Sequence, residues 1–150
     1  MSDRDTARTI IEEVGTLLAA DTDLQTLVQN EGETGMPVRF YNVWAPQDCE
    51  FPYMTCSLTM RQNVEDAFQQ GDLRVDVWDE GPSQERLFAM RARVVILLNR
   101  RIIEVRELKA RSWFEGDYDL SQPEVEVWRR SLGFTLRLYP TAEVAGMKAR

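Results

Sequence analysis

The sequence has 150 residues, 43% of them hydrophobic and 29% charged, which suits a single domain with an ordinary core rather than a membrane-embedded chain. Its net charge of −7 excludes the broad basic surface that proteins use to wrap nucleic acid, because phosphate neutralisation supplies most of that affinity. It has no histidine, the commonest general base, and its N-terminus lacks the apolar core of a secretory signal, so we expect a cytoplasmic chain.

The N-terminal part of the chain predicts two helices. Apolar residues recur at helical spacing over residues 5–20 and predict an amphipathic helix. The stretch Thr22–Gln25 fits a capping box, which predicts a short second helix that continues to about Val28.

The middle of the chain predicts three strands. β-Branched and aromatic residues predict a first strand over residues 37–44. A second strand follows Pro52, because apolar and polar residues then alternate with period two. The polar segment Gln62–Gly71 predicts a long connecting loop. The third strand, antiparallel to the second, is predicted from the alternating apolar residues Leu73, Val75 and Val77.

The C-terminal half predicts one helix and two further strands. A wide apolar stripe predicts a helix over about 83–99. A strand is predicted over 108–114 and an acidic turn over 115–123. The last strand is predicted over 124–139, with a bulge or bend near 128–131, because its apolar residues change from odd to even positions there.

This order of elements predicts an α+β fold. We expect an antiparallel or mixed sheet of four to five strands with two main helices packed on one face. Residues 1–150 form a single domain, and we expect residues 1–4 and 140–150 at its ends to be flexible.

Candidate catalytic groups are sparse. Asp76, Asp79 and Glu80 cluster at a strand end, but acids at a strand terminus and helix start are more often solvated groups that favour the helix dipole. The stretch Asp117–Asp119 is similar to part of a calcium loop, yet the glycine and distal glutamate of an EF-hand do not follow. The two cysteines show neither metal nor redox spacing. We therefore predict no catalytic residue, no metal and no cofactor.

Trp78 is the more informative residue. It lies on the polar phase of its strand, opposite Leu73, Val75 and Val77, so it faces outward if those three face the helices. It is either a partly covered aromatic or an interface anchor, since tryptophan is enriched at binding hot spots. A sheet with aromatics on both faces and a long loop is typical of a protein that assembles with others.

Several stretches resemble the tail-completion, or tail-terminator, family of long-tailed bacteriophages. Tyr41–Asn42, then Pro46–Gln47, then the "FPYMT" strand start at Phe51–Thr55 are similar to motifs of that family. The strand, turn and helix over Leu73–Leu98 and the closing strand over Arg129–Tyr139 follow in the family's order. The resemblance covers nearly the whole chain.

The resemblance implies a structural virion protein, with no enzymatic activity and no membrane. Such proteins assemble in the host cytoplasm into a homo-oligomeric ring, usually a hexamer, on the head-proximal end of the tail tube. They terminate tube polymerisation and join the tail to the head–tail connector, or neck, protein. DNA would pass through the lumen without specific binding, and we expect the acidic charge to help it slide.

Two sets of residues are assigned to these contacts. Arg74, Asp76 and Trp78 are predicted at the subunit interface. The long loop is predicted to contact the tube or a neighbouring subunit, through Gln62, Asn63, Glu65, Asp66, Phe68 and Gln70.

Two alternatives remain open. The chain could be a head–tail connector or neck protein of the same particle, which also forms rings. A remote alternative from another class is a small cytoplasmic carboxylate-dependent enzyme, against which the missing histidine weighs.

Overall fold

The computed structural model describes residues 3–30, 38–61, 69–105 and 108–140. The helices are α1 (Asp3–Ala19), α2 (Thr22–Leu27), α3 (Glu85–Leu98) and the short 3-10 turn η1 (Pro123–Val125). The strands are β1 (Phe40–Asn42), β2 (Tyr53–Met60), β3 (Gln69–Glu80), β4 (Ile102–Val105), β5 (Leu108–Asp119) and β6 (Val127–Pro140). Within these described ranges, no helix is both long enough and apolar enough to cross a membrane.

The strands form one six-stranded mixed sheet in the order β1-β2-β3-β6-β5-β4. Only β1 and β2 are parallel, and every other neighbouring pair is antiparallel, including the predicted β2–β3 pair. The α+β class is confirmed, but the predicted number of four to five strands is wrong. The missed strand is β4, whose four residues at the sheet edge are too few to show a period in the sequence.

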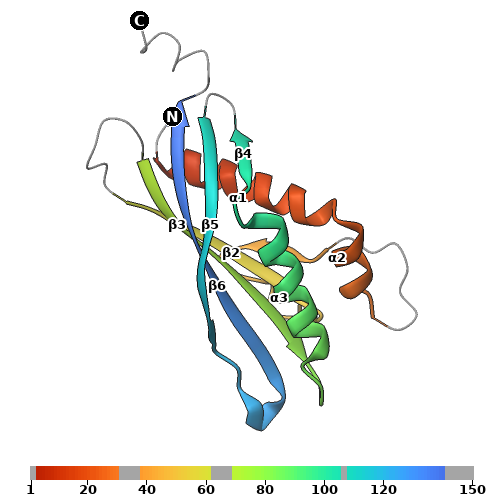
Figure 1. Cartoon of the computed structure of the whole chain (residues 1–150). Coiled ribbons are helices and arrows are strands. Elements are labelled where there is room, and N and C mark those ends of the chain that lie inside the picture. Colours follow the sequence, from red (N-terminus) through yellow and green to blue (C-terminus); the bar gives the residue numbers. More distant parts are fainter. Residues whose placement is uncertain (1–2, 31–37, 62–68, 106–107, 141–150) are drawn as a thin grey trace, which may run out of the picture.

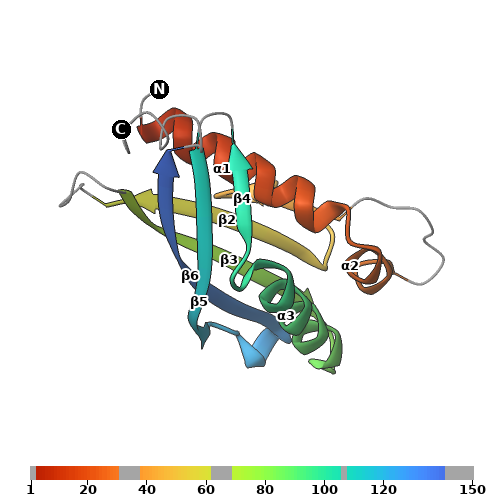
Figure 2. The ribbon, with the colours of Figure 1, turned by 45° about the horizontal axis from the view of Figure 1, so that its top comes forward.

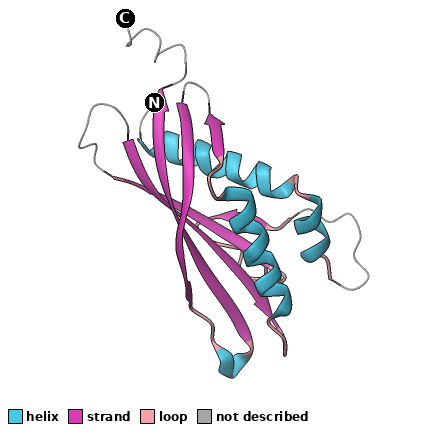
Figure 3. Cartoon of the chain, viewed as in Figure 1, coloured by secondary structure: helices cyan, strands magenta, loops and turns pink. Residues whose placement is uncertain are grey.

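The described α-helices cover one face of the sheet. Figures 1 and 2 show α1 crossing the sheet near one end, while α3 lies along the other end beside β3 and β6. The short α2 continues from α1 and packs beside α3. Figure 3 distinguishes the helices, in cyan, from the strands, in magenta. We call the helix-covered side the inner face and the other side the outer face.

Alternation along the strands places the core between the two layers. On β3, Leu73, Val75 and Val77 are fully buried and meet the apolar stripe of α3. That stripe consists of the buried residues Leu87, Met90, Val94 and Leu98. The helix α1 approaches the sheet closely at Gly15, where a Cβ atom would lie only 2.8 Å from the ring of Phe40. A side chain at residue 15 would therefore push α1 away from β1.

The predicted helices are confirmed with small shifts at their ends. The capping residue of α2 is Asp21 rather than Thr22, because the Asp21 carboxylate accepts a hydrogen bond from the Leu24 N–H at 3.0 Å. The first strand is shorter than predicted, with only Phe40–Asn42 in β1. Of the predicted loop Gln62–Gly71, residues 62–68 lie outside the described residues, and Gln70 belongs to β3 rather than to a loop.

The β5–β6 hairpin differs most from prediction. The predicted acidic turn over 115–123 is wrong, since β5 continues to Asp119 and the chain turns at η1. The bulge lies on β5 between Phe114 and Gly116, where Gly116 adopts a φ of +149°, and not on β6. Strand β6 pairs with β3 without interruption, so its inward residues are even-numbered throughout. The apparent change of phase arose because Val125 belongs to the turn and Val127 lies on the outer phase of β6.

Candidate functional site

The outer face of the sheet carries the residues predicted at an interface. Arg74, Asp76 and Trp78 project from β3 on this face, opposite the buried Leu73, Val75 and Val77. Because β3 is a central strand, each of them has a cross-strand neighbour on both β2 and β6. The structure thus gathers all three on one face, at the centre of the sheet; contact with another subunit stays a prediction.

Asp76 is the centre of a hydrogen-bonded network. Its side chain is on the uncovered face, yet the residue is only 5% exposed, because neighbours on β6 enclose it. The guanidinium Nε of Arg129 donates to Asp76 Oδ2 at 2.8 Å, and the hydroxyl of Ser131 donates to Oδ1 at 2.6 Å. Arg74 Nη1 in turn donates to the Ser131 hydroxyl at 2.8 Å. The carboxylate is fully engaged, so it orders the face rather than offering a free base.

Trp78 lies in a row of stacked side chains across three strands. Tyr53, Trp78 and Arg129 are cross-strand partners. The rings of Tyr53 and Trp78 stack with centroids 5.4 Å apart and planes at 17°, and the Arg129 guanidinium lies 4.4 Å from the Trp78 ring centre. The Trp78 indole N–H donates to Thr55 Oγ1 at 3.2 Å. Trp78 therefore faces outward, as predicted, but is half-buried by its own neighbours.

The connection between β1 and β2 adds an exposed tryptophan to this face. Val43 has a φ of +68°, and the Trp44 N–H donates to the Asn42 carbonyl at 2.8 Å, which makes a tight three-residue turn. This conformation is unfavourable for a β-branched residue and costs on the order of 1–3 kcal/mol. It leaves the Trp44 side chain 83% exposed. Sequence reasoning missed this residue, because only the turn decides that it points into solvent.

Two hollows adjoin one another on the outer face. The first, of about 410 Å³, lies between the Trp44 turn and the stacked row, and its lining includes Trp44, Tyr53, Asp76, Trp78 and Arg129. The second, of about 680 Å³, lies over β2, β3, β5 and β6. Ser57 and Arg74 line both, so the hollows form one polar depression with aromatic side chains along it.

The acids predicted to cluster do not converge. Asp79 projects to the inner face, where it is 2% exposed and accepts hydrogen bonds from Arg86 Nε at 2.9 Å and Nη2 at 2.7 Å. Asp76 projects to the opposite face, and Glu80 is exposed at the strand end. Two carboxylates on opposite faces of a sheet cannot share a substrate. Across the described ranges, no group of three acids or cysteines could hold a metal ion.

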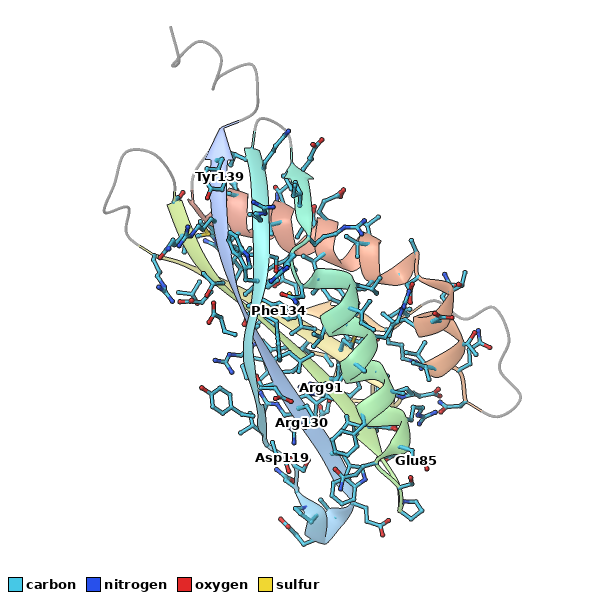
Figure 4. All side chains as sticks on the ribbon, in the orientation of Figure 1. Glu85, Arg91, Asp119, Arg130, Phe134 and Tyr139 are labelled. Carbon is cyan, nitrogen blue, oxygen red and sulfur yellow. The ribbon has the colours of Figure 1, made fainter. Side chains whose placement is uncertain are left out.

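The Asp117–Asp119 stretch is part of strand β5 and not a calcium loop. Arg91 of α3 and Arg130 of β6 both bind Asp117 Oδ2, at 2.7 and 2.8 Å, as the labels in Figure 4 help to locate. The hydrogen bond from Arg91, reinforced by Arg130, lowers the pKa of Asp117 to about 2. These contacts fasten α3 to the hairpin.

The two cysteines are free thiols. Cys56 is buried in the core, and burial raises the pKa of its thiol. Cys49 Sγ and the Tyr41 hydroxyl form a hydrogen bond at 3.3 Å, and this bond together with burial raises the pKa of Tyr41 to about 12. The buried Cys56 thiol therefore lacks the lowered pKa of a reactive cysteine.

Comparison with known proteins adds a structural likeness. No protein-family model matches the chain, and no curated protein matches it in sequence. Among solved structures, it is similar to a chain of a structure described as the virion of a native gene transfer agent particle. The likeness has a TM-score of 0.71 at 17% sequence identity and covers 93% of this chain and 99% of that chain. The two chains share their fold over most of their length.

Proposed function

We propose that this chain is a structural protein of a phage-like virion. The observation that carries the proposal is the fold shared with a virion chain over nearly the full length of both. An outer sheet face with an exposed tryptophan, stacked aromatics and a polar depression supports it, because such features are typical of protein interfaces. Asp76 and Asp79 are each held in an ion pair with an arginine, and they project to opposite faces of the sheet. This arrangement favours a role in assembly over carboxylate catalysis.

Within the virion, we place the chain at the head-proximal end of the tail. There it forms a homo-oligomeric ring, a hexamer as is usual in the tail-terminator family, that terminates the tail tube and joins the head connector. The tail-terminator motifs noted in the sequence support this position. Arg74, Asp76 and Trp78 serve the contact between subunits in this proposal, and DNA passes through the lumen without specific binding.

The test is electron microscopy of lysates from the parent phage or prophage after deletion of this gene. Loss of a terminator gives headless tails of uncontrolled length, and a plasmid-borne wild-type copy restores normal length. Tails of normal length beside DNA-filled heads would move the protein to the connector or neck. Intact, infectious particles would refute a virion role and return attention to an enzyme.

A further inference from the structure

The helix α3 carries a second set of apolar residues, on the side that faces away from the sheet. Phe88, Ala92 and Ile96 follow one another at intervals of four residues, so they lie along one side of the helix. All three are exposed, with exposed fractions of 48% for Phe88 and 66% for Ile96. Between them Ala92 has only a methyl group, which leaves a notch about one helical turn from each larger side chain. We call these three residues the outer stripe of α3.

The core does not account for the outer stripe. The buried residues of α3 already point to the sheet from the opposite side of the helix, and they are Leu87, Met90, Val94 and Leu98. Phe88 and Ile96 are eight residues apart, which corresponds to about 12 Å along the helix axis. Two large apolar side chains exposed in one line are more typical of an interaction site than of a solvated helix surface.

The outer face of the sheet has a groove of matching character. This is the hollow of about 410 Å³, which lies between Val43 and Trp44 of the β1–β2 turn on one side and Tyr53 and Trp78 of the stacked row on the other. Trp44 is 83% exposed and Val43 47%, so one wall of the groove is apolar and uncovered. The turn that positions this wall depends on the positive φ of Val43, and backbone strain of this kind is concentrated at binding sites.

Opposite charges lie beside the two apolar surfaces. Asp48 follows Trp44 in the same connection, and Arg100 follows Ile96 just past the end of α3. Both residues are exposed, and neither forms an ion pair with any residue in the part of the chain that the structure describes. An acidic group beside the groove and a basic group beside the stripe make the two surfaces complementary in charge as well as in apolar area.

The stripe and the groove cannot meet within one molecule. The helix α3 packs on the inner face of the sheet, against β3 and β6. The groove opens on the outer face, over β2 and β3. The sheet therefore lies between the two surfaces, and Figure 2 helps to follow the position of α3 relative to these strands. A contact between the stripe and the groove requires two copies of the chain.

We propose that the outer stripe of α3 in one copy docks in the groove beside Trp44 of the next copy. The Trp44 indole then lies in the notch at Ala92, between Phe88 and Ile96, while Asp48 meets Arg100 of the neighbouring copy. Removal of this exposed apolar area from water drives the contact. Stripe and groove are different surfaces, so the contact is heterologous and repeats from copy to copy until a ring closes. The inference rests on the proposed function, for which it supplies the contact between subunits.

The first test measures self-association of the full-length chain by sedimentation velocity, from about 1 to about 500 μM. We expect the wild type to associate, and Trp44→Ala and Ile96→Glu each to raise the dissociation constant at least about tenfold, because each removes apolar area from the centre of the contact. Val125→Glu is the matched control for Ile96→Glu. It places the same charge on an exposed apolar residue at the far turn and should behave as the wild type. A wild type that stays monomeric over this range, or folded variants that associate like the control, would overturn the docking.

A charge exchange tests the pairing of Asp48 with Arg100. Asp48→Arg and Arg100→Asp should each associate about three- to tenfold more weakly alone, because like charges then meet at the contact. A one-to-one mixture of the two variants should recover the wild-type affinity, since opposite charges meet again at every contact. A mixture that associates no better than either variant alone would contradict the docking.

Photo-cross-linking locates the contact directly. Chains labelled with ¹⁵N that carry Trp44→p-benzoylphenylalanine are mixed with unlabelled wild type, and irradiation should join residue 44 to the segment Leu87–Arg100 of an unlabelled chain. Cross-links within one chain only, or to segments outside α3, would overturn the docking. The deletion phenotype is a separate readout: tails of normal length in gene-deleted lysates, together with the expected cross-links, would refute the terminator role and leave the docking intact.

Discussion

Val75 and Asp76 are neighbours on β3, yet they belong to two different regions of the molecule. Val75 is completely buried on the inner face, where its neighbours are apolar and come from α3 and the adjacent strands. Asp76 is almost as buried on the outer face, but its neighbours are Arg129 and Ser131. The same alternation of side chains therefore builds an apolar layer on one side and a hydrogen-bonded layer on the other.

This difference separates stability from recognition. On the inner face, the described helices cover the sheet, and the apolar side chains between the two layers form the core. The outer face is ordered without being covered, since ion pairs and stacked rings hold its side chains in place. A preordered surface loses less side-chain entropy on binding, which suits the proposed role in assembly.

The largest expected effect comes from the centre of the inner face. Leu132→Ala removes a side chain that is 0% exposed on β6, and the cavity it leaves should lower the free energy of unfolding by about 2–5 kcal/mol. Thr135→Ala, on the outer face of the same strand, should cost less than about 1 kcal/mol. Urea denaturation followed by circular dichroism measures both. Equal losses from the two variants would contradict the division between the faces.

The next largest loss of stability should come from breaking a buried ion pair on the outer face rather than an exposed one. Asp76→Asn breaks the pair with Arg129 while keeping the hydrogen bond from Ser131, and should lower stability by about 1–3 kcal/mol. Asp72→Asn breaks the pair with Arg61, whose side chains are 49% and 51% exposed, and should cost less than about 1 kcal/mol. Both acids lie on β3, so each controls for the other in the same denaturation experiment. A larger loss for Asp72→Asn would show that the Asp76 network does not order the face.

A smaller effect depends on pH through Asp117 on the inner side. Its folded-state pKa of about 2 lies below the ordinary value of 3.8, so its ion pairs stabilise the fold above pH 4 and are lost as the pH falls toward 2. We expect this carboxylate to account for about 1–2 kcal/mol of lost stability over that window. Unfolding free energies at pH 6, 4 and 2.5 measure it. The Asp117→Asn variant should be less stable at pH 6 and should show a flatter pH dependence; an unchanged slope would refute the assignment.

The smallest effect on stability should accompany a clear effect on assembly. Trp44→Ala removes an 83% exposed side chain, so it should change the free energy of unfolding by less than about 0.5 kcal/mol. Although it folds normally, the Trp44→Ala variant should not restore normal tails in gene-deleted lysates if Trp44 anchors a partner protein. Val125→Ala, also exposed but at the far turn, provides a comparison for loss of apolar area alone. Full rescue by Trp44→Ala would remove the turn from the proposed interface.

The sequence predicted well what local periodicity controls. Period two on β2 and β3 correctly separated the buried Val75 from the outward Arg74 and Trp78, and helical spacing located α1 and α3. Prediction from periodicity failed where a strand was too short or too irregular to show a clear alternation of apolar and polar residues. Strand β4 has only four residues, and the bulge at Gly116 interrupts the alternation that would have extended β5 to Asp119.

The outer-face network could not be predicted for a different reason. Asp76 and Arg129 are 53 residues apart in the chain, and only the β3–β6 register brings them together. The exposure of Trp44 likewise depends on one turn with a positive φ at Val43, a residue type that does not signal such a turn. The sequence therefore identified residues of the outer-face network such as Asp76 and Trp78, but not the long-range contacts that they make.

The central pairing of β3 with β6 also has a consequence for folding kinetics. The pairs β2–β3 and β5–β6 join segments close in the chain, whereas β3–β6 closes a loop of roughly fifty residues that contains α3, at a higher entropic cost. We therefore expect the two hairpins to form early and to join late. Trp78 meets Tyr53 within one hairpin and Arg129 only after joining, so in a variant that keeps Trp78 alone of the four tryptophans its fluorescence would report this joining step.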